Sequence, residues 1–589
     1  MKEVKALETL VGEQRLSEED ARIRDEAYSR LSIWKQGCQE IHERARVARK
    51  ILLLDDPYQD PPNVPAEQKT MQLQTLKSTF NNCVADQVDN RPEALMTPET
   101  PELQNVVDDI NDIVRFIYEN NDYWYLHRFR VEDFIGTGTS VVQILWDERM
   151  ANGRGDVALL RVPVEQFLWD PAEEDIQNAR ALFKVSWHPL SWFRAQYPEN
   201  GVYVCDEENS VDAVGKNENQ EEMMADEKKA MLLEYWYRTY DAKKRRYTIN
   251  CMYLAGGAML EHYKDVYAHG MYPFVVDAFT EIRGLPVGEG LVMELAPMMR
   301  YINRYAHYMD VNIRQSSHIR MLVRNNSGLD VREVSDWTKD VITGDSIGEE
   351  SVRFLQSAPL TSLAMQQMYQ LQTDLKQDSG QNQFTRGETA GGVTAATAIA
   401  SLQEAGGKQT RMRTQTLNQG FQRITEQVLW LVSEFYGEHR VQMITGKDGE
   451  YRQVDASSSR LMGHSKKGGV VPPPPYTVRI QVQRLNPQAI QSQNELIMNA
   501  YTMAAQGGQP FPLSVLFSLL TVDGKDRILP VLQSLDAQMQ QMQQMAAENE
   551  QLQATVQQQQ DSINGMKKLI SEQVANAQQT STAGATPAK

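Results

Sequence analysis

Apolar side chains recur every three or four positions through the first 120 residues, a spacing that is typical of amphipathic helices. We expect helices over residues 1–54, 66–88 and 101–120, with a proline-rich break at 55–65 between the first two. Pro92 should end the second helix, because the residue before a proline is biased away from helical backbone angles.

An aromatic run follows the third helix, and we expect it to pack that helix onto the core. A base-stacking platform for nucleic acid is the alternative, but only Arg128 and Arg130 accompany the rings, whereas such platforms sit in a basic surround. The run comprises Tyr123, Trp124, Tyr125, Phe129 and Phe134.

From residue 136 the pattern changes to short β-branched and aromatic runs separated by turn residues. This pattern predicts a mostly antiparallel β region over 136–280, interrupted by an acidic, loop-like insertion at 205–229. A second β region is expected at 438–484. The fold class is therefore α+β.

Two long helices with a small insert between them are the most unusual architectural feature that the sequence predicts. The first begins near Glu289 and carries one apolar stripe, and a return helix covers about 360–376. Residues 321–357 between them read as a compact α/β segment. The stripe consists of Leu291, Leu295, Met298, Ile302, Tyr305, Met309 and Ile313.

The stretch from Gln381 to Arg413 begins with polar residues and glycines. A helix of mostly Ala, Thr and Ile is expected to follow over about 393–405. Glycine tolerates backbone angles that other residues resist, so its glycines predict a mobile loop and then a bend. An ordinary buried helix with a flexible entry loop fits these residues equally well. After the bend, a strong apolar stripe continues the helix through Leu417, Phe421, Ile424, Val428, Leu431 and Phe435.

Helices rich in Asn, Gln and Met are expected over 487–535, followed by a Gln-rich segment with a heptad pattern. The alternate core positions of these heptads include polar residues and so favour packing less. This indicates either a shallow seam in a wide ring of helices or a loosely ordered tail. Residues 576–589 are expected to be disordered. The stronger positions recur every seven residues at Leu535, Met542, Asn549, Val556, Ile563 and Ile570.

The composition indicates a folded chain of 589 residues, with 41% hydrophobic and 23% charged residues, enough for about four domain-sized units. The formal net charge of −18 disfavours a conventional nucleic-acid binder but suits a wall that nucleic acid must pass without being gripped. Four scattered cysteines, no signal peptide and no long apolar window predict a soluble protein made in a reducing cytoplasm, with no membrane partner.

The sequence contains no pattern that we interpret as a catalytic, cofactor-binding or metal site. The nearest match to a phosphate-binding loop, AGGKQT, lacks its first glycine and its Ser or Thr. His262 and His269 are seven residues apart, too far for a helical metal pair, and the acidic cluster at 108–112 is most simply the exposed face of a helix. An enzyme is therefore not the leading class.

Four segments, in this order and at these separations, resemble the portal proteins of tailed bacteriophages, in size the podovirus branch with a helical C-terminal extension. They are NNCVADQVDNRP at 81–92, LWDP at 168–171, YPFV…GLPVGEGLVMELAPMMRYIN within 272–303, and QNQFTRGETAGGVTAATAIASLQEAG at 381–406. The resemblance covers nearly the whole chain, least securely its first and last 50 residues.

The resemblance implies a homo-oligomeric ring, usually a dodecamer, at one capsid vertex of the virion, through which double-stranded DNA is packaged and ejected. It implies that the large terminase subunit docks first and tail adaptor or head completion proteins later, with major capsid and scaffolding proteins around the ring. It implies no cofactor. A coiled-coil-tailed scaffold or another capsid structural protein is the alternative.

Carried over onto this chain, the resemblance implies a portal-type subunit with the following parts: wing 1–288, stem helix 289–320, clip 321–357, stem return helix 358–376, tunnel loop 377–392, long kinked helix and second wing segment 393–486, crown 487–533, C-terminal helical or coiled-coil barrel 534–575, and disordered tail 576–589.

Three groups of residues then become candidates for function. Channel-facing positions of the tunnel loop are Gln381, Gln383, Arg386, Gly387, Gly391 and Gly392, and the kink is at Gly406 and Gly407. Candidate DNA or inter-subunit contacts are Lys376, Lys408, Arg411 and Arg413, for each of which a solvated or salt-bridged role is an equal alternative.

Overall fold

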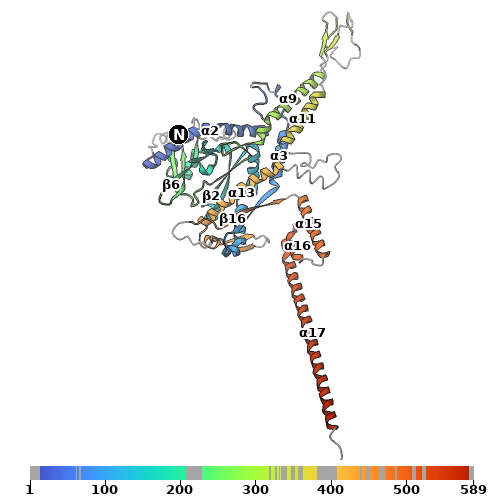
Figure 1. The fold of residues 1–589 in the computed structure, drawn as a ribbon. Helices are drawn as coiled ribbons and strands as arrows, with labels where there is room; N and C mark the ends of the chain where they lie inside the picture. The colour runs from blue at the N-terminus through green and yellow to red at the C-terminus, as the bar shows by residue number, and fades with distance from the viewer. Residues whose placement is uncertain are drawn as a thin grey trace, which may run out of the picture. The chain divides into compact units, whose positions relative to one another are not determined.

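The computed structural model describes residues 14–582 with gaps, and it divides into two units that we describe separately (Figure 1). The body unit comprises Met1–Ile444 and Arg452–Gln483, and the C-terminal unit comprises Thr445–Tyr451 and Arg484–Lys589. The gaps are 62, 66–67, 207–227, 318–319, 325–327, 331, 333–340, 342, 346–351, 356–361, 381–407, 438–440, 446–450, 463–470, 485–486, 507–511 and 521–524.

The first two predicted helices are present, but the second is shorter than expected. Helix α2 spans Glu18–Leu52 and α3 spans Thr75–Val88, so the expected start at residue 66 is wrong. Side chains hold the backbone before α3 in an irregular path: the Thr70 amide donates to Asp60 and the Leu73 amide donates to the Asn303 side chain.

Two residues of the aromatic run lie in the core, as expected, whereas Tyr125 is exposed. A 3-10 turn η2 (Pro101–Val106) leads into α4 (Val107–Asn120), and α5 (Tyr123–Gly136) follows. Tyr123 and Phe134 are fully buried, and the Tyr123 ring centroid lies 4.8 Å from Tyr118 and 5.2 Å from Phe421. These rings pack α4 and α5 against a helix almost 300 residues later in the chain.

The predicted antiparallel β region forms two sheets with strand orders β3-β2-β9 and β4-β5-β6-β7-β8. Their strands are β2 (Thr139–Asp147), β3 (Asp156–Val162), β4 (Phe167–Trp169), β5 (Ala181–Pro189), β6 (Lys229–Asp241), β7 (Arg246–Ala255), β8 (Ala258–Tyr263) and β9 (Phe274–Ala278). Most of the acidic insertion lies outside the described residues. The sequence did not predict β1 (Asn90–Pro98), which pairs with β16 (Tyr476–Arg484).

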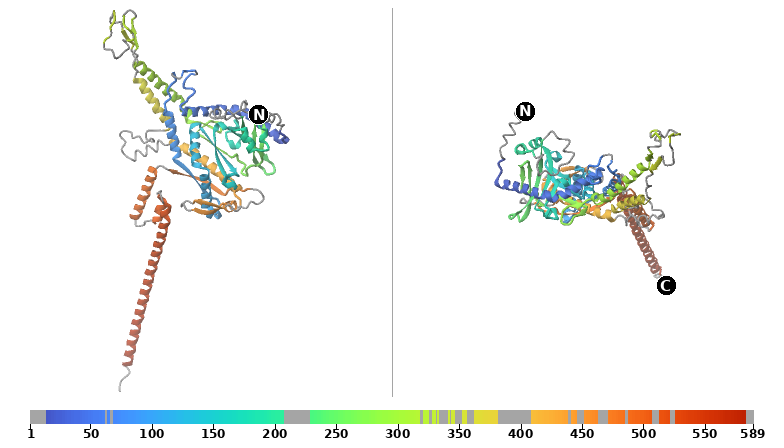
Figure 2. Two further views of the ribbon diagram at one scale, coloured as in Figure 1. Left: turned by 180° about the vertical axis from the view of Figure 1, so that it is seen from behind. Right: turned by 90° about the horizontal axis from the view of Figure 1, so that it is seen from above.

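The helix–insert–helix arrangement is present. Helices α9 (Leu291–Ser317) and α11 (Ser362–Asp378) run side by side, as the views in Figures 1 and 2 show. Between them, β12 (Arg320–Val323) and β13 (Val352–Leu355) form an antiparallel pair. The buried positions of α9 end at Asn303, and its later residues are half-buried or exposed in the single subunit.

Helix α13 (Lys408–Phe435) crosses the body unit and buries the predicted stripe, with Leu417, Phe421, Ile424, Val428 and Leu431 all in the core. The second β region follows as a hairpin of β14 (Val441–Thr445) and β15 (Tyr451–Asp455), a short helix α14 (Ser458–Met462) and then β16.

A buried ion pair fixes α13 to the sheet. The Arg130 guanidinium on α5 donates to Asp277 on β9 at 2.9 Å and to the Leu417 carbonyl at 2.8 Å. Ser140 on β2 also donates to Asp277, at 3.0 Å. Burial by itself would lower the pKa of Arg130, but Asp277 and Tyr123 raise it, so the guanidinium stays charged.

The C-terminal unit is helical: α15 (Pro487–Gln506), α16 (Leu513–Leu519) and α17 (Lys525–Thr582). Helix α17 runs without a break across the expected boundary at 533/534. It ends at Thr582, and the expectation of disorder at 576–589 remains a prediction. Within the unit, the Asp536 carboxylate accepts a hydrogen bond from the Ser514 amide at the start of α16.

Among the helices that the structure describes, none is long and apolar enough to cross a membrane.

We predict that Gly420→Ala destabilises the body unit by about 3–5 kcal/mol, because breaking a buried ion pair leaves an uncompensated charge. A Cβ on Gly420 would lie 1.8 Å from the Asp277 carboxylate and 2.3 Å from the Arg130 guanidinium. Thermal and urea unfolding of the purified subunit measure the change. Gly437→Ala is the matched control, since a Cβ there meets nothing within 4 Å, and equal stability of the two variants would contradict the prediction.

Candidate functional site

The chain leaves α11 and enters α13 at one place, which we call the junction: Cys83, Gln87, Ser379, Thr410 and Arg413. Gly380, in the turn after α11, has a φ of +87°, and a Cβ on it would clash with the Gln409 side chain at the start of α13. The two ends of the segment 381–407 are therefore held close together, although the segment itself lies outside the described residues.

All eight of the predicted loop and kink residues fall in that segment, and so does the small-residue helix expected at 393–405. Outside the described residues lie Gln381, Gln383, Arg386, Gly387, Gly391, Gly392, Gly406 and Gly407. Their predicted roles remain predictions.

Side chains from α3 and α13 and the backbone carbonyl of Ser379, just after α11, build the junction. Arg413 is 9% exposed; its guanidinium donates to the Ser379 carbonyl at 3.0 Å and lies 4.7 Å from the Phe279 ring. The Cys83 thiol also contacts the Ser379 carbonyl. Gln87 on α3 donates to the Thr410 carbonyl at 3.2 Å and accepts from the Thr414 hydroxyl at 2.9 Å. Helix α3 thus anchors both ends of the segment.

The electrostatics of the junction follow from its burial. Burial raises the pKa of the Cys83 thiol to about 11, so this thiol stays protonated at neutral pH. Burial also raises the pKa of Asp86 to about 6, with Asp89 contributing in the same direction and Arg413 opposing it. Asp86 therefore ionises at some cost to folding at neutral pH.

The structure separates the four predicted basic contacts into two groups. Lys408 and Arg411 are exposed on the first turn of α13, and Lys376 is half-buried near the end of α11. Arg413, by contrast, points into the subunit. Nothing in the sequence distinguished it from Arg411, because its burial depends on Ser379 and Cys83, which lie far away in the chain.

Sequence reasoning also missed the ion pair that holds α13. Arg130 was visible only as a cation beside the aromatic run, and no spacing linked it to Asp277. The helical stripe indicated which face of α13 is buried, but not that Gly420 stands where the ion pair needs room.

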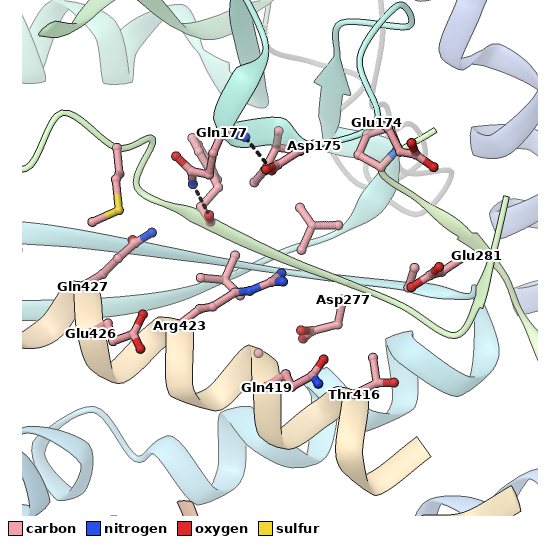
Figure 3. Close-up of a pocket in the computed structure, with 18 of the residues that line it drawn as sticks. Glu174, Asp175, Gln177, Asp277, Glu281, Thr416, Gln419, Arg423, Glu426 and Gln427 are labelled. Atoms are coloured by element: carbon pink, nitrogen blue, oxygen red, sulfur yellow. Dashed lines mark hydrogen bonds between the residues drawn. The ribbon is translucent and has the colours of Figure 1, made fainter. Parts of the chain in front are cut away.

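A pocket of about 540 Å³ lies along the same helix (Figure 3). Helix α13 supplies Gln419, Arg423, Glu426 and Gln427, which rise toward strand β9. The other walls come from the segment 174–177, from β9 and from the turn that contains Leu285 and Pro286.

The residues of the junction and of the pocket form structural contacts. The described residues contain no group of three His, Cys, Asp or Glu side chains that could hold a metal ion. The junction instead fixes the ends of one long segment to a rigid body, and the pocket presents polar side chains on its surface.

Comparison with known proteins gives one family. The model for the phage P22-like portal protein family matches residues 39–584. No match is found among curated proteins.

We predict that Arg413→Met destabilises the subunit by about 1–3 kcal/mol, because the buried Ser379 carbonyl loses its charged donor. Hydrogen–deuterium exchange should accelerate at the end of α11 and over the first turns of α13. Arg411→Met is the matched control, an exposed arginine on the same helix. If both variants exchange like the wild type, Arg413 does not hold the junction.

We predict that Asp86→Asn stabilises the subunit above about pH 6 and has no effect near pH 4. A folded-state pKa raised from 3.8 to about 6 means that the wild type loses stability as the pH rises between these values, because the folded protein resists ionisation. The measurement is the difference in unfolding free energy between variant and wild type across pH 4–8. Asp89→Asn should give a smaller change of the same sign, and a difference independent of pH would refute the prediction.

Proposed function

This chain belongs to the phage P22-like portal protein family, and from that premise we propose how its parts serve a portal. As a member, it forms the portal ring at a capsid vertex of the virion, through which DNA is packaged and ejected, and it is a structural protein, not an enzyme. The observation that carries this conclusion is the family match over residues 39–584, nearly the whole chain. A coiled-coil-tailed scaffold would not account for that match.

The paired helices α9 and α11 would form the stem (289–320 and 358–376), and the insert 321–357 would form the clip. Their surface supports this proposal. Large apolar side chains along both helices remain exposed in the single subunit, which favours burial against the same helices of neighbouring subunits. They include Tyr301, Tyr308, Ile313, Leu363, Met365 and Tyr369.

Residues 377–392 would form the tunnel loop facing the channel, with a kink at 406–407 in the helix behind it. The junction supports this proposal, because it fixes both ends of the segment 381–407 against α3. Lys376, Lys408 and Arg411 remain candidate contacts to DNA or to the next subunit. We do not extend this role to Arg413, whose guanidinium is committed to the Ser379 carbonyl.

The C-terminal unit would provide the crown (487–533) and a helical barrel (534–575). The heptad side chains of α17 support this proposal, since they are exposed along the helix in the single subunit: Leu535, Met542, Val556, Ile563 and Ile570. At 58 residues, α17 is about 87 Å long. Side-by-side packing of this helix from every subunit would cover these positions, and the weak alternate heptad positions suit a wide ring better than a tight dimer.

The wing would consist of 1–288 together with the β-rich part of 393–486. We propose a dodecamer that docks the large terminase subunit at the clip during packaging and tail adaptor or head completion proteins afterwards, with major capsid and scaffolding proteins around the wing. The net charge of −18 per subunit would let DNA slide through the channel with little net attraction to its wall.

We predict that a photo-crosslinking residue in place of Gln383 forms adducts with DNA in packaged particles, because the tunnel loop faces the channel. The same residue in place of Tyr240, an exposed position on the wing, is the control. Mass spectrometry of nuclease-treated subunits detects the adducts. DNA adducts at Tyr240 but not at Gln383 would place the loop away from the channel while leaving the family function intact.

A further inference from the structure

The pocket along α13 has an excess of negative charge that the subunit leaves uncompensated. Glu174, Asp175, Glu281 and Glu426 line it and are exposed, against the single cation Arg423. In the described part of the chain, none of these five side chains forms an ion pair. Three negative charges therefore remain after Arg423 is counted, which favours a cationic occupant.

A buried acceptor in the same pocket lacks a donor. Gln427 is 4% exposed, and its Nε2 donates to the Tyr272 carbonyl at 3.2 Å. A carbonyl can only accept, so this bond fixes the orientation of the amide. Gln427 Oε1 is then left without a hydrogen-bond partner among the described residues. Buried acceptors are nearly always paired in folded proteins, so Oε1 needs a donor that the described residues of the subunit do not supply.

The third wall of the pocket is an open strand edge. Strand β9 is at the edge of its sheet, and the Ile144 amide donates to Pro273 O while the Phe279 amide donates to Gly138 O. Alternation along an antiparallel strand then directs the backbone groups of Val276 and Ala278 away from β2. Both residues line the pocket, and no other described residue bonds to their outward N–H and C=O groups.

These three observations fit one occupant. We propose, on the basis of the portal-ring function above, that the pocket receives an extended basic segment of the neighbouring subunit. Its arginine or lysine side chain donates to Gln427 Oε1 among the carboxylates, and its backbone pairs with the outer edge of β9.

Two general arguments favour a peptide from a second copy of this chain. A small amine would use the carboxylates but not the open strand edge, which needs a peptide backbone. In a ring the contact is heterologous, so one surface of each subunit meets a different surface of the next. An acidic pocket can therefore face a basic segment of the same chain.

A photo-crosslinker at Gln419, an exposed residue of the pocket, tests the proposal in assembled rings. Rings mixed from isotopically light and heavy subunits separate adducts between subunits from adducts within one. We expect light–heavy adducts on a peptide that carries arginine or lysine, and none from a crosslinker at Glu199, an exposed position outside the pocket. Adducts confined to single subunits would overturn the inference.

Charge reversal provides a second test, because the carboxylates are exposed and their replacement should not prevent folding. We expect Glu281→Lys and Glu426→Lys to weaken subunit association at least about tenfold, with unchanged melting of the unassembled subunit. Glu199→Lys is the matched control. Electron microscopy and native mass spectrometry measure ring formation.

The outcomes distinguish a failure of the docking pocket from a failure of the portal-ring function. A wild-type chain that forms no ring would count against the portal-ring function itself. Rings of normal stability from both charge-reversal variants would refute the docking pocket while the ring stands. Binding of spermidine to the isolated subunit, lost in Glu426→Lys and without adducts between subunits, would assign the pocket to a small amine instead and would also refute it.

Discussion

The buried ion pair between Arg130 and Asp277 is the constraint on which the body unit depends. Each charge would be too costly to bury alone, so α5 and β9 must stay together, and the second bond of Arg130 to the Leu417 carbonyl adds α13 to the same unit. Gly420 lets α13 approach closely enough for this geometry. This buried polar contact set therefore holds the middle of α13 against α5 and β9.

Both functional features of α13 depend on that position. At its N-terminal end, the junction brings the start and end of the segment 381–407 together against α3. Midway along, the helix forms one wall of the acidic pocket. A helix that could slide or rotate would lose both at once. A rigid body with an anchored segment is what a channel subunit needs if DNA is to move past the ring without distorting it.

The sequence predicted what depends on local periodicity and missed what depends on distant partners. Stripes at helical spacing predicted α9 and α13, and short β-branched runs predicted the antiparallel β region, although not its division into two sheets. The start of α3 was wrong because Asp60 and Asn303 hold the backbone before it. Strand β1 was missed because its partner β16 lies near the other end of the chain. The basic run after the glycine pair was recognised, but burial of Arg413 was not, since Ser379 and Cys83 create it.

The single subunit leaves two different kinds of surface that assembly would satisfy. The heptad positions of α17 and the tyrosines of α9 and α11 are apolar, so their burial between subunits would be driven by the hydrophobic effect and would change little with salt. The pocket along α13 is polar, and charged contacts there would weaken as salt screens them. Apolar contacts of this kind are non-directional, whereas hydrogen bonds to Gln427 Oε1 and to the edge of β9 depend on the geometry of the partner. We therefore infer that the apolar surfaces supply most of the association energy, and that the polar pocket sets how one subunit is oriented against the next.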